Sequence, residues 1–271
     1  MRRALPCSVL LLLVCPLSLA ANDLKEIERR LKSDYEGKIV TLRKFHGGDS
    51  LRFSEDGQLL KGGEIGAWTL NGRIEIKDID VTAEKLDIYG HRVFVVYKKE
   101  GKQLVHSRNR DRFHLEIIFD SAVQDAGRIN RALTAVLVSK NDQLADLVPP
   151  YWRDFLSNAK PVVPGPQDVG SVQRDQVFRV GGTVSPFKCI FCPKPSYTAT
   201  ARKAKLEGSL LLWAVVNEHG TLVRLRVVRP LGLGLEESAV TTVNQWVFEP
   251  ARRFGKPVAV EFNLEIAFDL N

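Results

Sequence analysis

The sequence contains few cysteines and histidines, and it has no long apolar run after its first twenty residues. Its 271 residues include four cysteines and five histidines. The histidines occur singly, and none has a second ligand at the spacing of a metal site. Gly232-Leu233-Gly234 lacks the further residues of a phosphate-binding loop. We therefore predict no metal, no cofactor and no catalytic residue, and we expect the protein not to be an enzyme.

The sequence also lacks a long block of one charge sign. Its formal net charge of +7 falls to +5 if Arg2 and Arg3 are removed with a leader peptide, and acidic and basic residues are interspersed. Nucleic-acid binding is expected to need a clustered basic stripe. A solvated basic surface is the simpler interpretation, and we predict no nucleic-acid partner.

The one long apolar run has the order of a secretory signal. Arg2 and Arg3 precede the apolar residues 5–19, and Ser18-Leu19-Ala20 provides the small residues of a signal-peptidase site. We predict that residues 1–20 are a signal peptide and that the mature protein resides in the periplasm. The alternative is an uncleaved inner-membrane anchor that leaves the rest of the chain facing the periplasm, because the run reaches the lower length limit of a membrane span.

Cys189 and Cys192 are the two cysteines that remain after the predicted cleavage. In the oxidising envelope they are candidates for a small disulfide. Free thiols, and a redox or zinc site of the Cys-x-x-Cys type, are the alternatives. Pro186, Pro193 and Pro195 indicate an extended loop, whereas a redox motif normally begins a helix.

Residues 22–158 predict a β-rich domain with flanking helices and no recognised role. Its expected elements are a helix at 22–35 and short strands at 39–45, 51–53, 58–60, 67–70, 73–81, 86–89, 92–97 and 114–119. Turn dipeptides such as Asn71-Gly72 separate runs in which apolar and polar residues alternate. We predict an antiparallel β-meander over residues 38–120, as a curved sheet or an incomplete barrel.

Two features of this domain resemble ligand sites but have simpler explanations. Asp78, Asp80 and Asp87 alternate with apolar residues, as solvent-facing strand positions do. The basic run 108–112, between His106 and His114, is predicted to be a solvated loop.

Helices and a linker are predicted to follow the strands. Ser121 and Gln124 have the spacing of a capping box before an apolar helical face. Short helices are expected at 143–148 and 151–156. Residues 159–180 include a proline- and glycine-rich stretch and predict a linker to a second domain at 181–271.

The second domain begins with a helix and a hairpin. The helix is predicted at 198–206, with Ala201 and Ala204 on its buried side and Gly208 as its left-handed cap residue. Strands at 209–216 and 221–229 then flank a loop in which Gly220 supplies a positive φ.

A second helix and a long strand complete this domain. The helix is expected at 235–247, with Glu236 and Glu237 favourably placed in its first turn. In the strand at 258–270, every second residue from Val258 to Leu270 is apolar. That face needs a cover of helices.

The residues at about 184–271 resemble the TonB C-terminal domain family. The matching residues are Pro195-Ser196-Tyr197, Ala201-Arg202, Glu207-Gly208, Asn217-Glu218-His219-Gly220, Gly234-Leu235, Ala239, Gln245 to Ala251, Gly255-Lys256-Pro257-Val258 and Phe268. Thr198 departs from the family, which usually has proline there. The resemblance implies an α+β fold with a three-stranded antiparallel sheet and two helices on one face. It gives structural roles to Tyr197, Gly208, Gly220, Gly234, Leu235, Trp246, Phe248 and Pro250.

The resemblance also implies a function in protein binding. In the family the last strand is a sheet edge that pairs with a short segment of an outer-membrane receptor, in energy-coupled transport. The corresponding residues here are Val258, Val260, Glu261, Phe262, Asn263, Leu264, Glu265, Ile266 and Ala267. An exposed edge also permits a homodimer. A scaffold for envelope assembly and a thiol-redox protein are the alternative functions.

Two departures weaken the analogy to a complete energy transducer. The first apolar segment has no histidine, although the family's motor-coupled anchor normally carries one. The linker stretch 161–175 reaches at most about 50 Å when fully extended, which is short for a periplasmic rod. We therefore expect a periplasmic adaptor or scaffold that uses the binding module.

Overall fold

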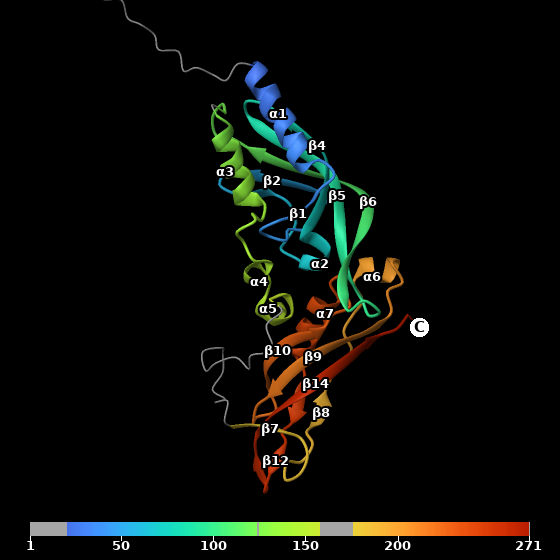
Figure 1. Cartoon of the computed structure of the whole chain (residues 1–271). Coiled ribbons are helices and arrows are strands. Elements are labelled where there is room, and N and C mark those ends of the chain that lie inside the picture. The colour runs from blue at the N-terminus through green and yellow to red at the C-terminus, as the bar shows by residue number, and fades with distance from the viewer. Residues whose placement is uncertain (1–20, 124, 158–175, 271) are drawn as a thin grey trace, which may run out of the picture.

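The computed structural model describes residues 21–123, 125–157 and 176–270. It has a six-stranded sheet in the first half of the chain and a four-stranded sheet in the second half, with helices packed on them (Figure 1). The second half also contains two small sheets of two strands each. The predicted α+β class is confirmed. The predicted signal peptide, Gln124 and most of the predicted linker lie outside the described residues. Among the helices that the structure describes, none combines the length and the apolar character that a membrane span requires.

The N-terminal sheet has six strands in the order β1-β4-β5-β6-β2-β3. The strands are β1 (Ile39–Thr41), β2 (Ser50–Ser54), β3 (Leu59–Lys61), β4 (Arg73–Val81), β5 (Lys85–Lys98) and β6 (Gln103–Ile118). The predicted meander is β4–β5–β6, whose neighbours are antiparallel. However, β2 pairs with β6 in parallel, from Ser50 opposite His114 to Ser54 opposite Ile118. Local alternation of side chains carries no information on such a distant pairing, so the sequence did not predict it.

Two strands are longer than the sequence indicated. A single strand, β5, replaces the predicted pair at 86–89 and 92–97 and runs through Gly90. At Gly90 a Cβ atom would lie 2.1 Å from the carbonyl oxygen of Glu75, so the close approach of β4 requires glycine here. The basic run 108–112 is part of β6, and its prediction as a loop was wrong. Arg108 forms an ion pair with Glu75 at 3.2 Å, so charges on this strand are accommodated across the sheet.

Residues 67–70 were predicted as a strand but begin the short helix α2 (Trp68–Asn71). The amide of Asn71 donates to the carbonyl oxygen of Ala67 at 2.9 Å. A short apolar run does not distinguish a buried helical turn from a strand. In the structure this run forms a helical turn, in which Trp68 and Thr69 are both buried.

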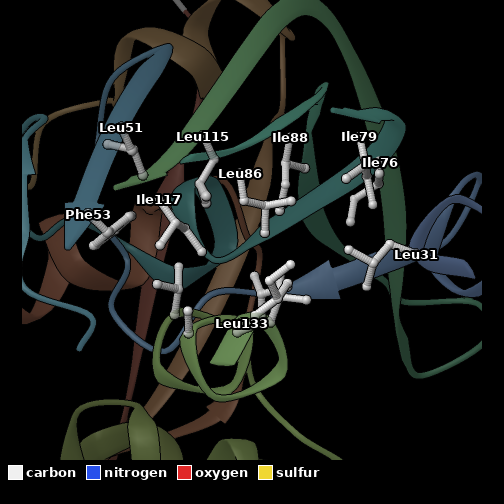
Figure 2. Packing of buried hydrophobic residues seen from close by; sticks show 14 of the residues in the cluster. Leu31, Leu51, Phe53, Ile76, Ile79, Leu86, Ile88, Leu115, Ile117 and Leu133 are labelled. Atoms are coloured by element: carbon white, nitrogen blue, oxygen red, sulfur yellow. The ribbon is translucent and has the colours of Figure 1, made fainter. Parts of the chain in front are cut away.

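Helices α1 (Ala21–Tyr35) and α3 (Ala126–Val136) cover one face of this sheet. Figure 2 shows Leu31 of α1 and Leu133 of α3 pointing toward the apolar side chains of the strands. The cap of α3 is Asp125, whose side chain accepts the amide of Arg128 at 2.9 Å. The predicted capping box at Ser121 was therefore wrong, because the helix begins five residues later.

Two short helices, α4 (Leu144–Leu147) and α5 (Pro150–Leu156), lead toward the second half. Its sheet has the order β10-β9-β14-β7. The elements are β7 (Val177–Arg179), β8 (Lys188–Phe191), α6 (Ala199–Lys203), β9 (Gly208–Val216), β10 (Leu222–Arg229), α7 (Leu235–Val243), β11 (Val247–Glu249), β12 (Arg252–Arg253), β13 (Lys256–Pro257) and β14 (Ala259–Phe268). Strands β10, β9 and β14 form the expected antiparallel sheet. Both α6 and α7 pack on its apolar face.

The structure adds a fourth strand to this sheet. Strand β7 lies in the segment 159–180 that was predicted as a linker, and it pairs in parallel with the beginning of β14. A three-residue strand is too short to show an alternating pattern, although Val177 and Phe178 do form a small apolar pair after the glycine-rich stretch.

The first helix of this half ends earlier than predicted. Ala204 is the C-cap residue and is exposed, and Lys205 adopts the left-handed conformation with φ of 50°. Gly208, which was predicted to cap the helix, instead begins β9 with φ of 142°. Helix α7 likewise ends at Val243, and Trp246 lies beyond it.

Candidate partner-binding edge

The last strand, β14, is paired with β9 along one side from its second residue to its last. Its register with β9 runs from Val260 opposite Val216 to Phe268 opposite Gly208. On the other side it pairs only with β7, at Ala259, Val260 and Glu261. Within the described part of the chain, residues 262–268 of β14 therefore form an open sheet edge. We call these residues the open edge.

The side chains of the open edge alternate between two environments. Phe262, Leu264, Ile266 and Phe268 point toward the apolar cover and are half-buried or buried. Asn263, Glu265 and Ala267 are exposed. The alternation fixes the register of β14, because a slip of one residue would exchange the two faces.

The exposed Glu265 is hydrogen-bonded to side chains of the neighbouring strands β9 and β10. Its Oε1 accepts a hydrogen bond from Ser209 Oγ at 2.5 Å and from Arg229 Nη2 at 2.8 Å. The hydroxyl and the guanidinium hold the pKa of Glu265 below its usual value. The carboxylate thus belongs to the sheet surface beside the open edge.

The structure places the nine predicted edge residues in three different situations. Val258 precedes β14, and its amide donates to the carbonyl oxygen of Ala251 at 2.9 Å. Val260 and Glu261 have β7 beside them. The other six residues, 262–267, lie on the open edge. The sequence could not indicate this division, because it depends on β7.

A surface hollow of about 420 Å³ lies where β7 leaves β14. Its lining residues are Arg179, Val180, Trp213, Glu261, Phe262 and Asn263. Arg179 Nε donates to Glu261 Oε1 at 2.7 Å on one side of it. The guanidinium of Arg226 lies over the Trp213 ring, with its Cζ atom 3.9 Å from the ring centroid. The hollow is therefore lined by mixed polar and aromatic groups at the start of the open edge.

The opposite edge of the same sheet is close to a helix. Helix α5 packs against β10. Asp154 of α5 accepts a hydrogen bond from Arg226 of β10 at 2.7 Å. The two sides of the sheet thus differ, because β10 has a helix against it, whereas residues 262–268 of β14 have no strand on their outer side within the described ranges.

The family-motif residues support the strands around this edge. The Tyr197 hydroxyl donates to the carbonyl oxygen of Leu206 at 3.2 Å, and its ring meets Phe268 edge-on at 5.3 Å. Trp246 Nε1 donates to the carbonyl oxygen of Pro193 at 2.9 Å. Phe248 is buried. The Phe248 ring also meets that of Phe262 at 6.1 Å between centroids, so Tyr197 and Phe248 connect the apolar cover to the two ends of the open edge.

Residues 193–270 match the family described as the Gram-negative bacterial TonB protein C-terminal domain. This part of the chain is a TonB C-terminal domain. The match covers less than a third of the 271 residues. No curated protein matched the chain. Domains of the TonB C-terminal family are protein-interaction modules of the periplasm-facing envelope, so the coarse prediction of a protein-binding role is supported.

The TonB C-terminal domain shares its core with the first half of the chain. Trp68 and Trp152 meet edge-on at 5.3 Å between their ring centroids, and both are fully buried. They belong to one apolar cluster with Leu233 and Leu235 of the C-terminal domain. The two predicted domains therefore meet through a continuous core in this structure.

Hydrogen bonds also connect the two halves of the chain where their cores meet. We call this contact region, around Val95, Trp152 and Leu233, the joint. The amide of Tyr97 donates to Leu231 O at 3.0 Å, and the amide of Leu233 donates to Val95 O at 3.2 Å. The amide of Gly234 donates to Thr69 Oγ1 at 2.9 Å. The predicted role of Gly234 at the start of the next helix is compatible with this, since it is the N-cap of α7 with φ of 75°.

The loop before α7 is conformationally costly. Leu233 has φ of 54°, a left-handed conformation that costs about 1–2 kcal/mol for a residue with a side chain. Its side chain is buried in the joint. The sequence showed the Gly-Leu-Gly spacing but could not show that its partner was Val95, far away in the chain.

Two neighbouring glutamates begin α7 inside this joint. Glu236 is fully buried and accepts the amides of Leu231 and Gly232. Burial raises its pKa. Glu237 accepts Trp152 Nε1 at 2.9 Å, and burial together with the neighbouring Glu236 raises its pKa to about 7. Their predicted place in the first turn of this helix is confirmed, but the sequence did not show that Trp152 and the loop at Leu231–Gly232 would be their partners.

Replacing Glu237 by glutamine should change how stability depends on pH. The folded protein holds the Glu237 proton more tightly than the unfolded chain, where the pKa is near 4.5. Its stabilising effect is therefore complete below that value and is lost as pH rises through about 7. Glutamine keeps an oxygen acceptor for Trp152 without a charge, so Glu237→Gln should raise the Tm at mildly alkaline pH and leave it nearly unchanged at acidic pH.

Thermal unfolding of the variant and the wild type across this pH range measures the effect. Glu249→Gln is the control, because Glu249 is an exposed glutamate of the same domain. An equal difference in Tm at acidic and alkaline pH would contradict the assignment.

The cysteines are brought together outside the open edge. Cys189 and Cys192 form a disulfide with their Cα atoms 6.1 Å apart. The described residues contain no cluster of three or more histidine, cysteine, aspartate or glutamate side chains able to hold a metal ion.

Proposed function

We propose that the open edge binds an extended segment of a partner protein by β-augmentation. The observation that carries this proposal is the one-sided pairing of β14: its residues 262–268 have β9 on one side and, among the residues that the structure describes, no strand on the other. In this mode the backbone supplies most of the affinity, and alternate side chains select the sequence. The hollow beside Trp213 is suited to take one partner side chain at the start of the edge.

The proposed partner is the periplasmic segment of an outer-membrane receptor or of another envelope protein. Family membership of residues 193–270 supports a protein partner. The joint with the N-terminal half supports an adaptor that presents the domain in a fixed orientation, and coupling to transport is the finer part of the proposal. Pairing of two copies through the same edge is the competing use.

Strand β7 limits where the partner pairs. It occupies β14 at Ala259–Glu261, and the ion pair of Arg179 with Glu261 secures its end. A partner segment that extends past Phe262 toward the start of β14 must displace β7. A partner confined to 262–268 need not do so.

The proposal is tested by titrating the isotope-labelled chain from residue 21 with synthetic peptides from the N-terminal segments of the host's receptors. The whole chain is used because the C-terminal domain shares its core with the N-terminal half. We expect amide shift changes concentrated at residues 262–268. Absence of changes at millimolar peptide, or changes that avoid β14, would refute the proposal, and concentration-dependent changes without peptide would indicate self-pairing.

A variant of β7 tests its role in the same assay. Phe178→Gly removes a half-buried ring that packs beside Val260 and so weakens β7 without adding charge. We expect longer peptides to bind more tightly and the shift changes to reach Ala259. Unchanged affinity for every peptide would show that β7 and the partner do not compete.

A further inference from the structure

A short hairpin projects from the TonB C-terminal domain at the end of the molecule opposite α1 (Figure 1). It consists of β12 and β13, with Arg252 opposite Pro257 and Arg253 opposite Lys256. Phe254 and Gly255 form its turn. We call residues 252–257 the tip hairpin. Its residues belong neither to the buried core nor to the open edge.

Phe254 is an unexpected residue for this turn. It has φ of 49° and Gly255 has φ of 80°, so both central residues are left-handed, as in a type I′ turn. Such turns favour asparagine followed by glycine. A bulky side chain in the left-handed region is a steric outlier. Local turn chemistry therefore does not explain the choice of phenylalanine.

Packing does not explain the ring either. Phe254 is 77% exposed, the highest value among the large hydrophobic residues that the structure describes as exposed. Its ring contact is with the guanidinium of Arg253, whose Cζ lies 5.4 Å from the ring centroid. A residue that breaks local rules without a gain in packing is expected at a functional site.

The surroundings of the ring are basic. The tip hairpin contains three exposed basic residues and no acidic one: Arg252, Arg253 and Lys256. The neighbouring segment 179–188 adds Arg179 and Lys188. Within the described ranges, the three basic residues of the tip hairpin form no ion pair, whereas Arg179 is paired with Glu261. The nearest acidic partner of Lys188 in the register is Glu249 of β11.

The tip hairpin is bonded to the neighbouring segment around Ser185. The amide of Ser185 donates to Arg252 O at 2.8 Å, and the amide of Arg252 donates to Ser185 Oγ at 3.0 Å. The Arg253 guanidinium also lies over the Phe178 ring at 4.8 Å. These contacts hold the Phe254 ring outward with cationic groups around its base.

We propose that the tip hairpin docks on an anionic phospholipid surface, with the Phe254 ring entering the interface and Arg252, Arg253 and Lys256 meeting the headgroups. Charge complementarity supports a lipid surface, because clustered Arg and Lys are attracted to anionic leaflets. Apolar side chains amid basic ones are typical of interfacial anchors. A projecting tip fits a flat, fluid surface, which requires no matching pocket.

Flotation of the chain from residue 21 with phospholipid vesicles tests this proposal. The probes are vesicles of phosphatidylcholine alone and of phosphatidylcholine with one third phosphatidylglycerol. We expect binding to the mixed vesicles only, and we expect it to weaken as salt is added, because exposed charges are screened. Binding to neither vesicle, or to both equally, would overturn the proposal.

Phe254→Asn is the decisive variant, because asparagine is the residue that this turn prefers and should fold at least as well. We expect binding to mixed vesicles to fall about tenfold, because the ring that would enter the lipid is lost. Arg253→Gln together with Lys256→Gln should abolish it. Phe254→Asn should have a Tm at least as high as that of the wild type, and both variants should bind edge peptides as the wild type does.

Two results would assign the tip hairpin differently. Vesicle binding by Phe254→Asn as tight as that of the wild type would remove the ring from the interaction. Equal binding to soluble polyglutamate and to the mixed vesicles would indicate an acidic protein partner and overturn the lipid proposal.

Discussion

Gly220→Ala should strongly destabilise the C-terminal domain, whereas Gly255→Ala should cost only the backbone penalty of a left-handed alanine, about 1–2 kcal/mol. The two glycines have almost the same backbone, with φ of 78° and 80°. A Cβ atom on Gly220 would lie 1.8 Å from the carbonyl oxygen of Phe248, while one on Gly255 would meet nothing within 4 Å. The left-handed conformation alone costs about 1–2 kcal/mol with alanine, so a loss of about 3–5 kcal/mol is expected for Gly220→Ala.

Urea unfolding followed by circular dichroism measures both variants. The difference between them isolates the close approach of the hairpin loop to β11, since the backbone cost is common to both. The amide of Phe248 donates to Gly220 O at 3.0 Å, so the contact that excludes a side chain also contributes a hydrogen bond. Equal losses of stability would show that the loop can move away from Phe248.

Trp152→Ala should lower the free energy of unfolding by about 3–5 kcal/mol, the usual range for a large aromatic residue in a core. Trp152 is fully buried between the two halves of the chain and touches Trp68 and Phe155 edge-on. The change also removes the donor to Glu237, which leaves a half-buried carboxylate without its indole partner.

Urea unfolding of this variant should show whether the two halves depend on one another. The midpoint should shift for signals from both sheets, because the cavity lies in their shared core. Phe254→Ala is the control, since an exposed aromatic residue of the same chain should change stability by no more than about 0.5 kcal/mol. A shift confined to one sheet would show that the shared core contributes little.

The C-terminal elements could be predicted because their signals are local. The alternating apolar residues of 258–270 and the continuous apolar run of β9 fix both strands without reference to any partner. The turn at Gly220 was likewise evident from the residues beside it. Helix and strand ends were less predictable, as at Lys205, because capping depends on which residue happens to take the left-handed conformation.

Pairings between distant residues were not predictable. Strand β2 joins β6 in parallel, and the loop at Leu231–Leu233 pairs with Val95. Nothing in either sequence segment specifies the other. The same limitation affected the candidate site, since the length of the open edge depends on β7, a three-residue strand within the segment predicted as a linker.

The attachment of β7 to the same chain sets a condition on any competing ligand. A tethered segment has an effective concentration of about millimolar, which dilution does not lower. A partner that pairs with all of β14 would therefore compete with β7 at a fixed effective concentration. A partner confined to residues 262–268 would not compete with β7. Because β7 ends at Arg179, the fold would favour the binding of short partner segments over long ones.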